Sequence, residues 1–232
     1  MTYDHPEFAG SKVHAKVLKP RDSATLILVR KGAGSPRILM GQRAQGHAFM
    51  PNKYVFPGGR LDAADCRVRP AQDLHPATMA KLLQRMRGKP TETRARGVAY
   101  AAVRETWEEA GLLFGRSRLE DAPDLSGLTL FMRAITPPGR TRRYDSRFFV
   151  ADADHLSNID QPHHDGGGEL LTQSWLTLDE IASLDLPLIT IDALKRLKPF
   201  LDQGRLPPQD CTASFQYFRG KNWVEDEISP AP

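Results

Sequence analysis

Apolar residues in the first part of the chain fall into short runs that predict β-strands. Residues 23–29 and 37–40 are rich in aliphatic side chains, and the Gly- and Pro-containing segment 31–36 separates them. Two such runs joined by a turn-rich segment predict a β-hairpin. A third run, at 54–56, leads into the Pro-Gly-Gly sequence at 57–59, which predicts a strand followed by a tight turn where glycine allows a ligand to approach the backbone.

Two longer apolar runs in the second half predict an antiparallel strand pair. They cover 128–135 and 142–151, and the turn sequence Thr-Pro-Pro-Gly at 136–139 lies between them. Trp175 and Leu176 predict a short further strand. The T-x-x-E sequence that starts at Thr177 is a capping box, which predicts the start of a short helix.

Apolar residues also recur at helical spacing in two places. The first stripe consists of Leu74, Met79, Leu82, Leu83 and Met86. It predicts a helix that ends near Gly88 and Pro90, either as a folded lid or as simple packing against the core. The second stripe consists of Ile191, Leu194, Leu197 and Leu201. It predicts a helix over about 188–203 with Gly204 as its cap, followed by a Pro-rich tail beyond Leu206.

Three carboxylates dominate the sequence Arg-Glu-Thr-Trp-Glu-Glu-Ala-Gly-Leu at 104–112. On a helix, Glu105, Glu108 and Glu109 lie within one arc, opposite an apolar side that can pack. Like charges at this spacing repel one another, and a bound cation removes that repulsion. Mg²⁺ prefers oxygen ligands and completes its shell with water and phosphate oxygens, so phosphate chemistry is expected. The alternative is that the glutamates form ordinary solvated surface.

This acidic sequence resembles the second half of the Nudix hydrolase signature, G-x5-E-x7-R-E-U-x-E-E-x-G-U, where U is aliphatic. Arg104 and Glu105 match the R-E pair, and Gly59 matches the opening glycine. Thr106 replaces an aliphatic residue, which is a mild change because a β-branched side chain has a similar shape. Arg104 follows Gly59 by 45 positions instead of 14, so 31 residues are inserted, at a small cost in loop-closure entropy.

The first glutamate of the signature is displaced or absent. Eight positions before Arg104 lies Arg96, which carries the opposite charge. Asp62, Asp65 and Glu92 are the candidates to substitute for the glutamate, and the local sequence does not choose among them.

The resemblance covers about residues 23–183 and implies a fold and domain organisation. The expected fold is an α/β (α+β) sandwich of the Nudix type, with a mixed sheet between helices. We expect a single domain over 1–232, a helical insertion at 61–93 and a C-terminal helix and tail at 184–232.

The resemblance also implies a metal-dependent cleavage of a diphosphate. Glu105, Glu108 and Glu109 are expected to bind Mg²⁺ or Mn²⁺, and Arg104 to orient a glutamate. The catalytic base is Glu105 or Glu169, which follows a glycine-rich loop and is otherwise an ordinary loop residue.

The expected substrate is a nucleoside diphosphate linked to a group X. Arg43 and Arg60 flank the Pro-Gly-Gly sequence and are expected to bind the diphosphate or a 3′-phosphate of the substrate, together with Gly58 and Gly59. Three other arginines are weaker candidates that ordinarily stay hydrated: Arg140, Arg142 and Arg143.

The interrupted signature and the Phe-Met-Pro sequence at 49–51 are similar to the mammalian peroxisomal CoA diphosphatases, which implies CoA or acyl-CoA as the substrate. ADP-ribose or NADH, or a nucleotide- or metal-binding module without catalysis, are the alternatives. His163, His164 and Asp165 lack the spacing of a zinc site and are not assigned as ligands.

The whole chain has the composition of an ordinary globular protein. Its 232 residues carry a net charge of +4, too small an excess for a dedicated nucleic-acid binder. Cys66 and Cys211 are the only cysteines, which favours a reducing compartment. With neither a signal-peptide pattern nor a membrane-length apolar run, we expect a cytoplasmic enzyme with a small-molecule substrate, no membrane contact and a possible homodimer.

Overall fold

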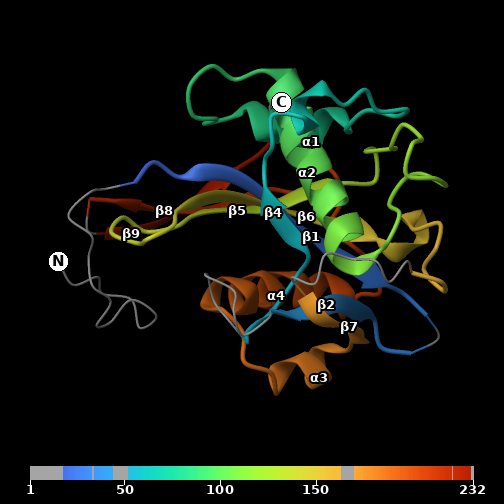
Figure 1. Ribbon diagram of the computed structural model, residues 1–232. Coiled ribbons are helices and arrows are strands. Elements are labelled where there is room, and N and C mark those ends of the chain that lie inside the picture. Colours follow the sequence, from blue (N-terminus) through green and yellow to red (C-terminus); the bar gives the residue numbers. More distant parts are fainter. Residues whose placement is uncertain (1–17, 33, 44–51, 163–169, 221, 231–232) are drawn as a thin grey trace.

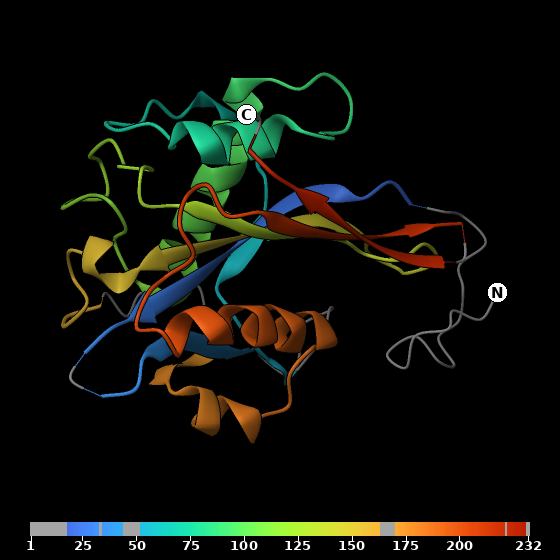
Figure 2. The same cartoon turned by 180° about the vertical axis from the view of Figure 1, so that it is seen from behind.

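A mixed β-sheet between two helical layers forms the centre of the molecule (Figures 1 and 2). The computed structural model describes residues 18–32, 34–43, 52–162, 170–220 and 222–230. The strands of the described chain are β1 (Arg21–Arg30), β2 (Arg37–Arg43), β3 (Tyr54–Val55), β4 (Gly58–Arg60), β5 (Thr129–Ile135), β6 (Tyr144–Asp152), β7 (Leu170–Leu176), β8 (Ala213–Arg219) and β9 (Asn222–Ile228). The helices are α1 (Pro76–Leu83), α2 (Glu92–Ala110), α3 (Leu178–Ala182) and α4 (Leu188–Leu201), with short 3-10 turns at Asp65–Arg67 and Ala153–His155.

The strand order in the sheet is β3-β2-β1-β6-β5-β8-β9, with β4 paired to β1 and β7 paired to β2. β1 runs parallel to β6 along nearly its whole length and antiparallel to β2 and β4 at its two ends. The hairpin predicted for β1 and β2 and the antiparallel pair predicted for β5 and β6 are confirmed. The α/β sandwich with a mixed sheet that the sequence predicted is therefore present.

Alternation along β1 builds a hydrophobic core on each face of the sheet. Leu26 and Leu28 are fully buried in the core beneath α2. Ile27 and Val29 are fully buried in the core beneath α4. The central strand is therefore covered on both sides, which explains its almost continuous apolar sequence.

Helix α2 carries the acidic sequence and is capped at both ends. The Thr91 hydroxyl accepts a hydrogen bond from the Arg94 amide at 3.2 Å. Gly111 ends the helix with a φ of 65°, a left-handed conformation that favours glycine. The capping box predicted at Thr177 is also present and opens α3.

The stripe predicted for the insertion packs into the core beneath α2. Leu74, Met79, Leu82 and Met86 are buried, and α1 contacts α2 and β5. Lys81, one position before Leu82, is fully buried and donates to the carbonyls of Leu130 and Cys211, each at 2.8 Å. These side chains therefore lie in the hydrophobic core, which is the arrangement that the packing interpretation describes. Because α2 begins at Glu92, the last two residues of the predicted 61–93 insertion belong to that helix.

The structure differs from the predicted secondary structure in one turn, and it adds to the prediction in two places. Gly58 and Gly59 do not form a tight turn but lie in β4, paired with Thr25 and Ala24 of β1. β7 is longer than the two residues predicted. The C-terminal tail contains the hairpin β8–β9, whose first strand pairs parallel to β5 and extends the sheet (Figure 2).

In the part of the chain that the structure describes, no helix is long and apolar enough to cross a membrane.

Candidate active site

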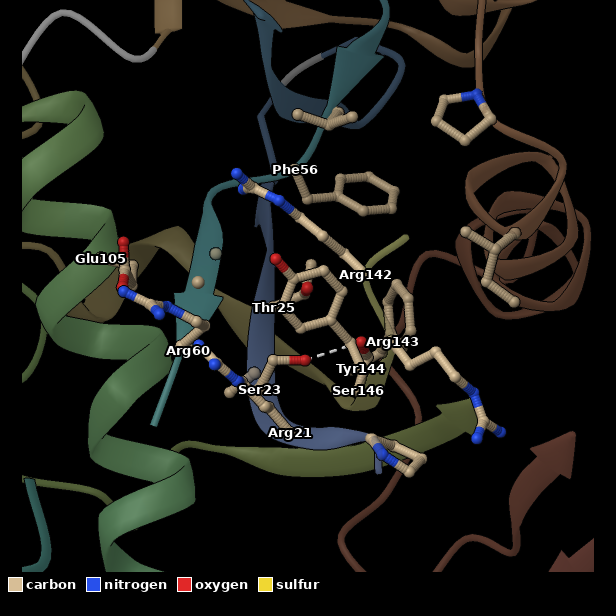
Figure 3. Close-up of a pocket in the computed structure, with 18 of the residues that line it drawn as sticks. Arg21, Ser23, Thr25, Phe56, Arg60, Glu105, Arg142, Arg143, Tyr144 and Ser146 are labelled. Atoms are coloured by element: carbon tan, nitrogen blue, oxygen red, sulfur yellow. Dashed lines mark hydrogen bonds between the residues drawn. The ribbon is translucent and has the colours of Figure 1, made fainter. Parts of the chain in front are cut away.

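A cavity of about 1040 Å³ lies on the face of the sheet that α4 covers. Its floor is formed by alternate residues of β1 and β6, including Ser23 and Ser146, whose hydroxyl oxygens are 2.7 Å apart. The N-terminal end of α4 and the strands β3 and β4 form its walls, and Glu105 of α2 lies at one side (Figure 3). Glu108 of the same helix also lines the cavity. The two halves of the predicted signature therefore meet at one cavity.

Close packing explains the glycines of β4. A Cβ atom on Gly58 would lie 2.8 Å from the Cα atom of Thr25 and against the carbonyl of Ala24. A Cβ atom on Gly59 would overlap the carboxylate of Glu105. Neither glycine has a positive φ. The sequence pointed to these glycines for their conformational freedom, but their role in the structure is to let β1 and α2 approach the strand.

The guanidinium of Arg104 joins the acidic residues of the site. Its Nη1 donates to Glu105 Oε1 at 2.9 Å and to Glu108 Oε2 at 2.7 Å. Its Nη2 donates to the carbonyl of Arg60 at 2.9 Å, which ties α2 to β4. Burial alone would lower the pKa of Arg104, but the hydrogen bond with Asp65 and the charges of Glu105 and Glu108 outweigh it and raise the pKa. Arg104 therefore stays charged and holds two carboxylates on one side of the cavity.

Of the three candidates for the first signature glutamate, Asp65 is the one that pairs closely with Arg104. It follows Gly59 by six positions, which is the spacing of the first glutamate in the signature. Its side chain is 1% exposed and accepts from Arg104 Nε at 2.9 Å and Nη2 at 3.2 Å. Asp62, which lines the cavity, is 4.0 Å from Arg104, and Glu92 pairs with Arg96 instead. Asp65 therefore combines the spacing of that glutamate with a direct contact to Arg104.

The three glutamates of α2 differ in their surroundings. Glu108 is the most open, with 49% of its side chain exposed, and Glu105 is largely buried. Glu109 is 4% exposed and accepts a hydrogen bond from the Gly58 amide at 2.8 Å. Contrary to the sequence analysis, Glu109 therefore does not lie on an open acidic face. Thr106 is buried, and its hydroxyl donates to the carbonyl of Ala102 in the same helix. This hydrogen bond satisfies the hydroxyl, so threonine is tolerated at a position that is aliphatic in the signature.

The carboxylates fit a metal that takes few protein ligands. Within the described ranges, no three histidine, cysteine, aspartate or glutamate side chains are gathered as a metal site. Glu105 and Glu108 nevertheless lie within hydrogen-bonding distance of the same Arg104 nitrogen and both line the cavity. Mg²⁺ commonly takes one or two carboxylates and fills its remaining positions with water and phosphate oxygens, so this pair suits it.

Basic residues line the rest of the cavity. Arg43 and Arg60, the two arginines favoured by the sequence analysis, both line it. So do Arg142 and Arg143 of the weaker candidates, together with Arg21 (Figure 3). Lys19 lines the cavity as well. The sequence analysis missed Lys19 and Arg21. The parallel register that pairs Arg21 with Tyr144 brings them to the cavity, and nothing in the sequence predicted that register.

Three features discussed above lie outside the described residues. They are Glu169, the Phe-Met-Pro sequence at 49–51, and the group His163, His164 and Asp165. The role of Glu169 as a catalytic base stays a prediction.

A chain of buried ion pairs supports the floor of the cavity from the opposite face of the sheet. Arg147, 1% exposed, donates to Asp22 at 2.6 Å, and Asp22 also pairs with Arg94. Asp145 accepts two hydrogen bonds from Arg133, both at 2.8 Å. Burial alone would raise the pKa of Asp22, but Arg147 and Arg94 outweigh it and lower the pKa. The charges on this face of β1 and β6 are therefore already paired.

Comparison with known proteins finds several that are named as Nudix hydrolases. No protein-family model matches the chain. The human acyl-coenzyme A diphosphatase NUDT19 is 33% identical over 145 residues, which are 52% of this chain and 38% of that protein. The match thus spans little more than a third of the length of that relative. A crystal structure of a Nudix hydrolase from Alicyclobacillus acidocaldarius has a TM-score of 0.59 and 23% identity, covering 82% of this chain and 99% of the other.

A second solved structure, a MutT Nudix hydrolase from Burkholderia pseudomallei, has a TM-score of 0.49 and 20% identity, covering 78% of this chain and 99% of the other. The sandwich architecture, the first of these structures and the position of the two signature halves beside one cavity agree with one another. The chain therefore has the fold of the Nudix hydrolases, and the resemblance predicted from its interrupted signature is confirmed.

Proposed function

We propose that this protein hydrolyses the diphosphate bond of a nucleoside diphosphate linked to a group X, with the help of a divalent metal ion. The observation that carries the proposal is the convergence of Glu105 and Glu108 on Arg104 at one side of a basic cavity. Carboxylates beside arginines suit a substrate whose phosphates need both a metal and cationic side chains.

Glu105 and Glu108 are proposed as the metal ligands that face the cavity, and Glu109 as a third carboxylate beneath β4. Mg²⁺ or Mn²⁺, when bound, would neutralise phosphate charge and lower the pKa of an attacking water. Arg104 holds Glu105 and Glu108 in position through its Nη1 atom. Gly58 lets β4 approach β1, and Gly59 lets it approach Glu105 of α2. Both glycines are proposed to let the substrate phosphates approach this part of the cavity.

The base that accepts a proton from the attacking water is proposed to be Glu105 or Glu169. Glu105 lines the cavity and contacts Arg104. A carboxylate that holds a charge next to a bound water can accept its proton directly. Arg43 and Arg60 line the same cavity and are proposed to bind the diphosphate.

CoA or acyl-CoA is proposed as the substrate. Two observations support it: the partial identity with a protein named as an acyl-coenzyme A diphosphatase, and a cavity with more basic residues than a diphosphate alone requires. ADP-ribose and NADH are the alternative substrates. A cytoplasmic location and a homodimer stay predictions.

The test is a hydrolysis assay with Mg²⁺ on CoA, acetyl-CoA, ADP-ribose, NADH and dinucleoside polyphosphates. We expect CoA to yield adenosine 3′,5′-bisphosphate and 4′-phosphopantetheine, with a loss of about a hundredfold or more in Glu108→Gln and in the presence of EDTA. Glu120→Gln, an exposed glutamate away from the cavity, is the matched control and should keep full activity. Cleavage of ADP-ribose alone would exclude CoA.

A nucleotide-binding module without catalysis is the rival function. It predicts that none of these compounds is cleaved at any metal concentration, while one of them still raises the melting temperature of the protein. That combination of results would overturn the proposed hydrolysis.

A further inference from the structure

The first turn of helix α4 forms one wall of the cavity and has hydrogen-bond donors to offer. Pro187, Ile189 and Thr190 of this turn line the cavity. Pro187 is the N-cap residue, and its side chain has no atom that could accept a hydrogen bond from the turn. Within the described chain, the amides of Leu188 and Ile189 donate to no carbonyl or side chain. The wall therefore presents fixed N–H donors to a ligand.

Thr190 adds a buried hydroxyl to the same turn. The residue is 3% exposed. Its hydroxyl makes no hydrogen bond with any residue that the structure describes, whereas the hydroxyl of Thr106 in α2 bonds to the carbonyl of Ala102 one turn earlier. Buried polar groups in proteins nearly always have a partner. A buried hydroxyl beside a cavity and without a partner therefore points to a ligand that supplies one.

The surfaces next to this turn are apolar and aromatic. Phe56 and Phe148 line the cavity and belong to the core beneath α4, against which Ile189 packs. The amide of Tyr54 donates to the Asp185 carbonyl at 3.0 Å, which ties β3 to the segment before α4. These contacts hold the aromatic side chains and the first turn of α4 at one place in the cavity.

This wall differs in character from the acidic side of the cavity. The ring of Phe56 points away from Glu105 and towards α4 (Figure 3). The first turn of α4 has the sequence Leu-Ile-Thr-Ile and carries no charged side chain. Flat heteroaromatic rings stack on aromatic side chains and form hydrogen bonds along their edges. The wall therefore suits an uncharged planar group with a hydrogen-bonding edge.

We propose that the Thr190 hydroxyl and the Ile189 amide bind the nucleobase of the substrate, which lies against the apolar wall that contains Phe56. The proposal rests on the proposed function, because it places the diphosphate at Glu105 and Glu108. Adenine has an acceptor nitrogen next to an amino group. The amide donates to this nitrogen, and the hydroxyl accepts from the amino group. CoA, ADP-ribose and NADH all contain adenine, so this contact binds their common part.

The test measures the binding of AMP and of ribose 5-phosphate, which lacks the base, by titration calorimetry. The wild type should bind AMP about tenfold more tightly, because a stacked base contributes most of the affinity. Thr190→Val has the same shape without the hydroxyl, and it should weaken AMP binding by about fivefold or more and leave ribose 5-phosphate unchanged. Thr190→Ser keeps the hydroxyl and should bind AMP like the wild type. Thr93→Val, at an exposed position in the first turn of α2, is the matched control and should change neither affinity.

The melting temperature of the unliganded protein separates a ligand contact from a structural role. Removal of a buried hydroxyl that has no partner should leave the melting temperature of Thr190→Val equal to that of the wild type or higher. A lower melting temperature would show that the hydroxyl supports the fold, and it would overturn the proposal.

Two binding results would also overturn the nucleobase assignment. One is an equal loss of affinity for AMP and ribose 5-phosphate in Thr190→Val. The other is weaker binding of 4′-phosphopantetheine with unchanged binding of AMP, which would place the group X at this wall.

An assay of CoA hydrolysis with Mg²⁺ distinguishes this proposal from the proposed function. If CoA is cleaved but Thr190→Val binds AMP like the wild type, the nucleobase site is wrong and the hydrolysis stands. If nothing is cleaved but the expected changes in AMP binding are seen, the hydrolysis is wrong and the nucleobase site stands.

Discussion

Arg104 and Asp65 form a paired contact between the two separated halves of the sequence signature. Nε and Nη2 of the arginine donate to the two carboxylate oxygens of the aspartate at 2.9 and 3.2 Å. The two residues are 39 positions apart. The Asp65 carboxylate also accepts from the Asp62 amide at 2.8 Å, so its own turn holds it in place. The inserted segment does not separate β4 and Asp65 from α2. The contact between Arg104 and Asp65, and the hydrogen bond from Arg104 to the Arg60 carbonyl, hold them together.

Replacement of Asp65 by asparagine should weaken both the site and the fold. The side chain is almost fully buried, and the amide would lose the charge that balances Arg104. We expect the free energy of unfolding to fall by roughly 1–3 kcal/mol. Catalytic turnover should fall by about tenfold or more because Arg104 no longer holds Glu105 and Glu108 in place.

Asp73→Asn is the matched control for Asp65→Asn, because it removes an ion pair with another arginine of α2 outside the cavity. Asp73 is 2.8 Å from Arg96, and 44% of its side chain is exposed. Urea unfolding and kcat with the same substrate should both stay close to wild type in this variant. Equal losses in the two variants would show that the buried pairing has no special role.

Gly59→Ala should reduce activity without much loss of stability. The added methyl group would overlap the carboxylate of Glu105, which is the end of a flexible side chain and is able to move away. We expect a change in unfolding free energy below about 1 kcal/mol and a fall in kcat of about tenfold or more, because Glu105 is displaced.

Gly58→Ala and Gly32→Ala complete this comparison. At Gly58 the methyl group meets the backbone of Ala24 and Thr25, so destabilisation by about 1–3 kcal/mol is expected. At Gly32 there is no atom within 4 Å, and the variant should resemble wild type in both measurements. A Gly59→Ala protein with full activity would show that the position of Glu105 does not matter for turnover.

Local patterns predicted the helices and most strands. Which charged side chains are buried and which reach the cavity depends instead on pairing between distant segments. The stripe that contains Leu82 and the capping box at Thr177 are periodic signals within one element, and the structure has both elements. The burial of Glu109 depends on where β4 crosses α2, and Arg21 reaches the cavity through its pairing with Tyr144. Neither pairing is encoded within a short stretch of the sequence. The hairpin β8–β9 was missed because it follows a Pro-rich segment and is stabilised by its contact with β5.

Asp22→Asn should remove a pH-dependent part of the stability. In the folded protein Arg147 and Arg94 keep the pKa of Asp22 below its ordinary value, despite the opposing effect of burial. A carboxylate whose pKa is lower in the folded than in the unfolded protein stabilises the folded state at pH values above about 4. This stabilisation is lost as the pH falls through the pKa of the folded state. We therefore expect the variant to lose roughly 3 kcal/mol at pH 7, since Arg147 is left buried beside a neutral group.

Urea unfolding of both proteins between pH 3 and pH 7 measures this effect. The difference in unfolding free energy between wild type and Asp22→Asn should shrink as the pH falls below about 4. Asp160→Asn removes an exposed partner of Arg30 and should give no such trend. A constant difference across the pH range would contradict the assignment.

Mg²⁺ should stabilise the protein through Glu105 and Glu108. Their carboxylates share one Arg104 nitrogen, so an added cation relieves the remaining repulsion between them. In thermal unfolding, 5 mM Mg²⁺ should raise the melting temperature of the wild type, by about 2–4 °C for each kcal/mol of stabilisation, which equals RT ln(1 + [Mg²⁺]/Kd). The shift should disappear in Glu108→Gln and persist in Glu120→Gln. A shift of equal size in Glu108→Gln would place the metal elsewhere.

Leu82→Ala tests whether helix α1 of the insertion acts as a lid or only packs. Leu82 is 2% exposed in the core beneath α2, and no residue of α1 lines the cavity. Deleting a buried leucine side chain leaves a hole, so a loss of about 2–5 kcal/mol in unfolding free energy is expected. At a temperature where the variant is fully folded, kcat and KM should equal those of the wild type. The exposed Lys89→Ala variant, just beyond α1, should alter neither quantity. A change in KM for Leu82→Ala, with stability restored by low temperature, would mean that α1 moves with the substrate, because packing alone affects only the amount of folded protein.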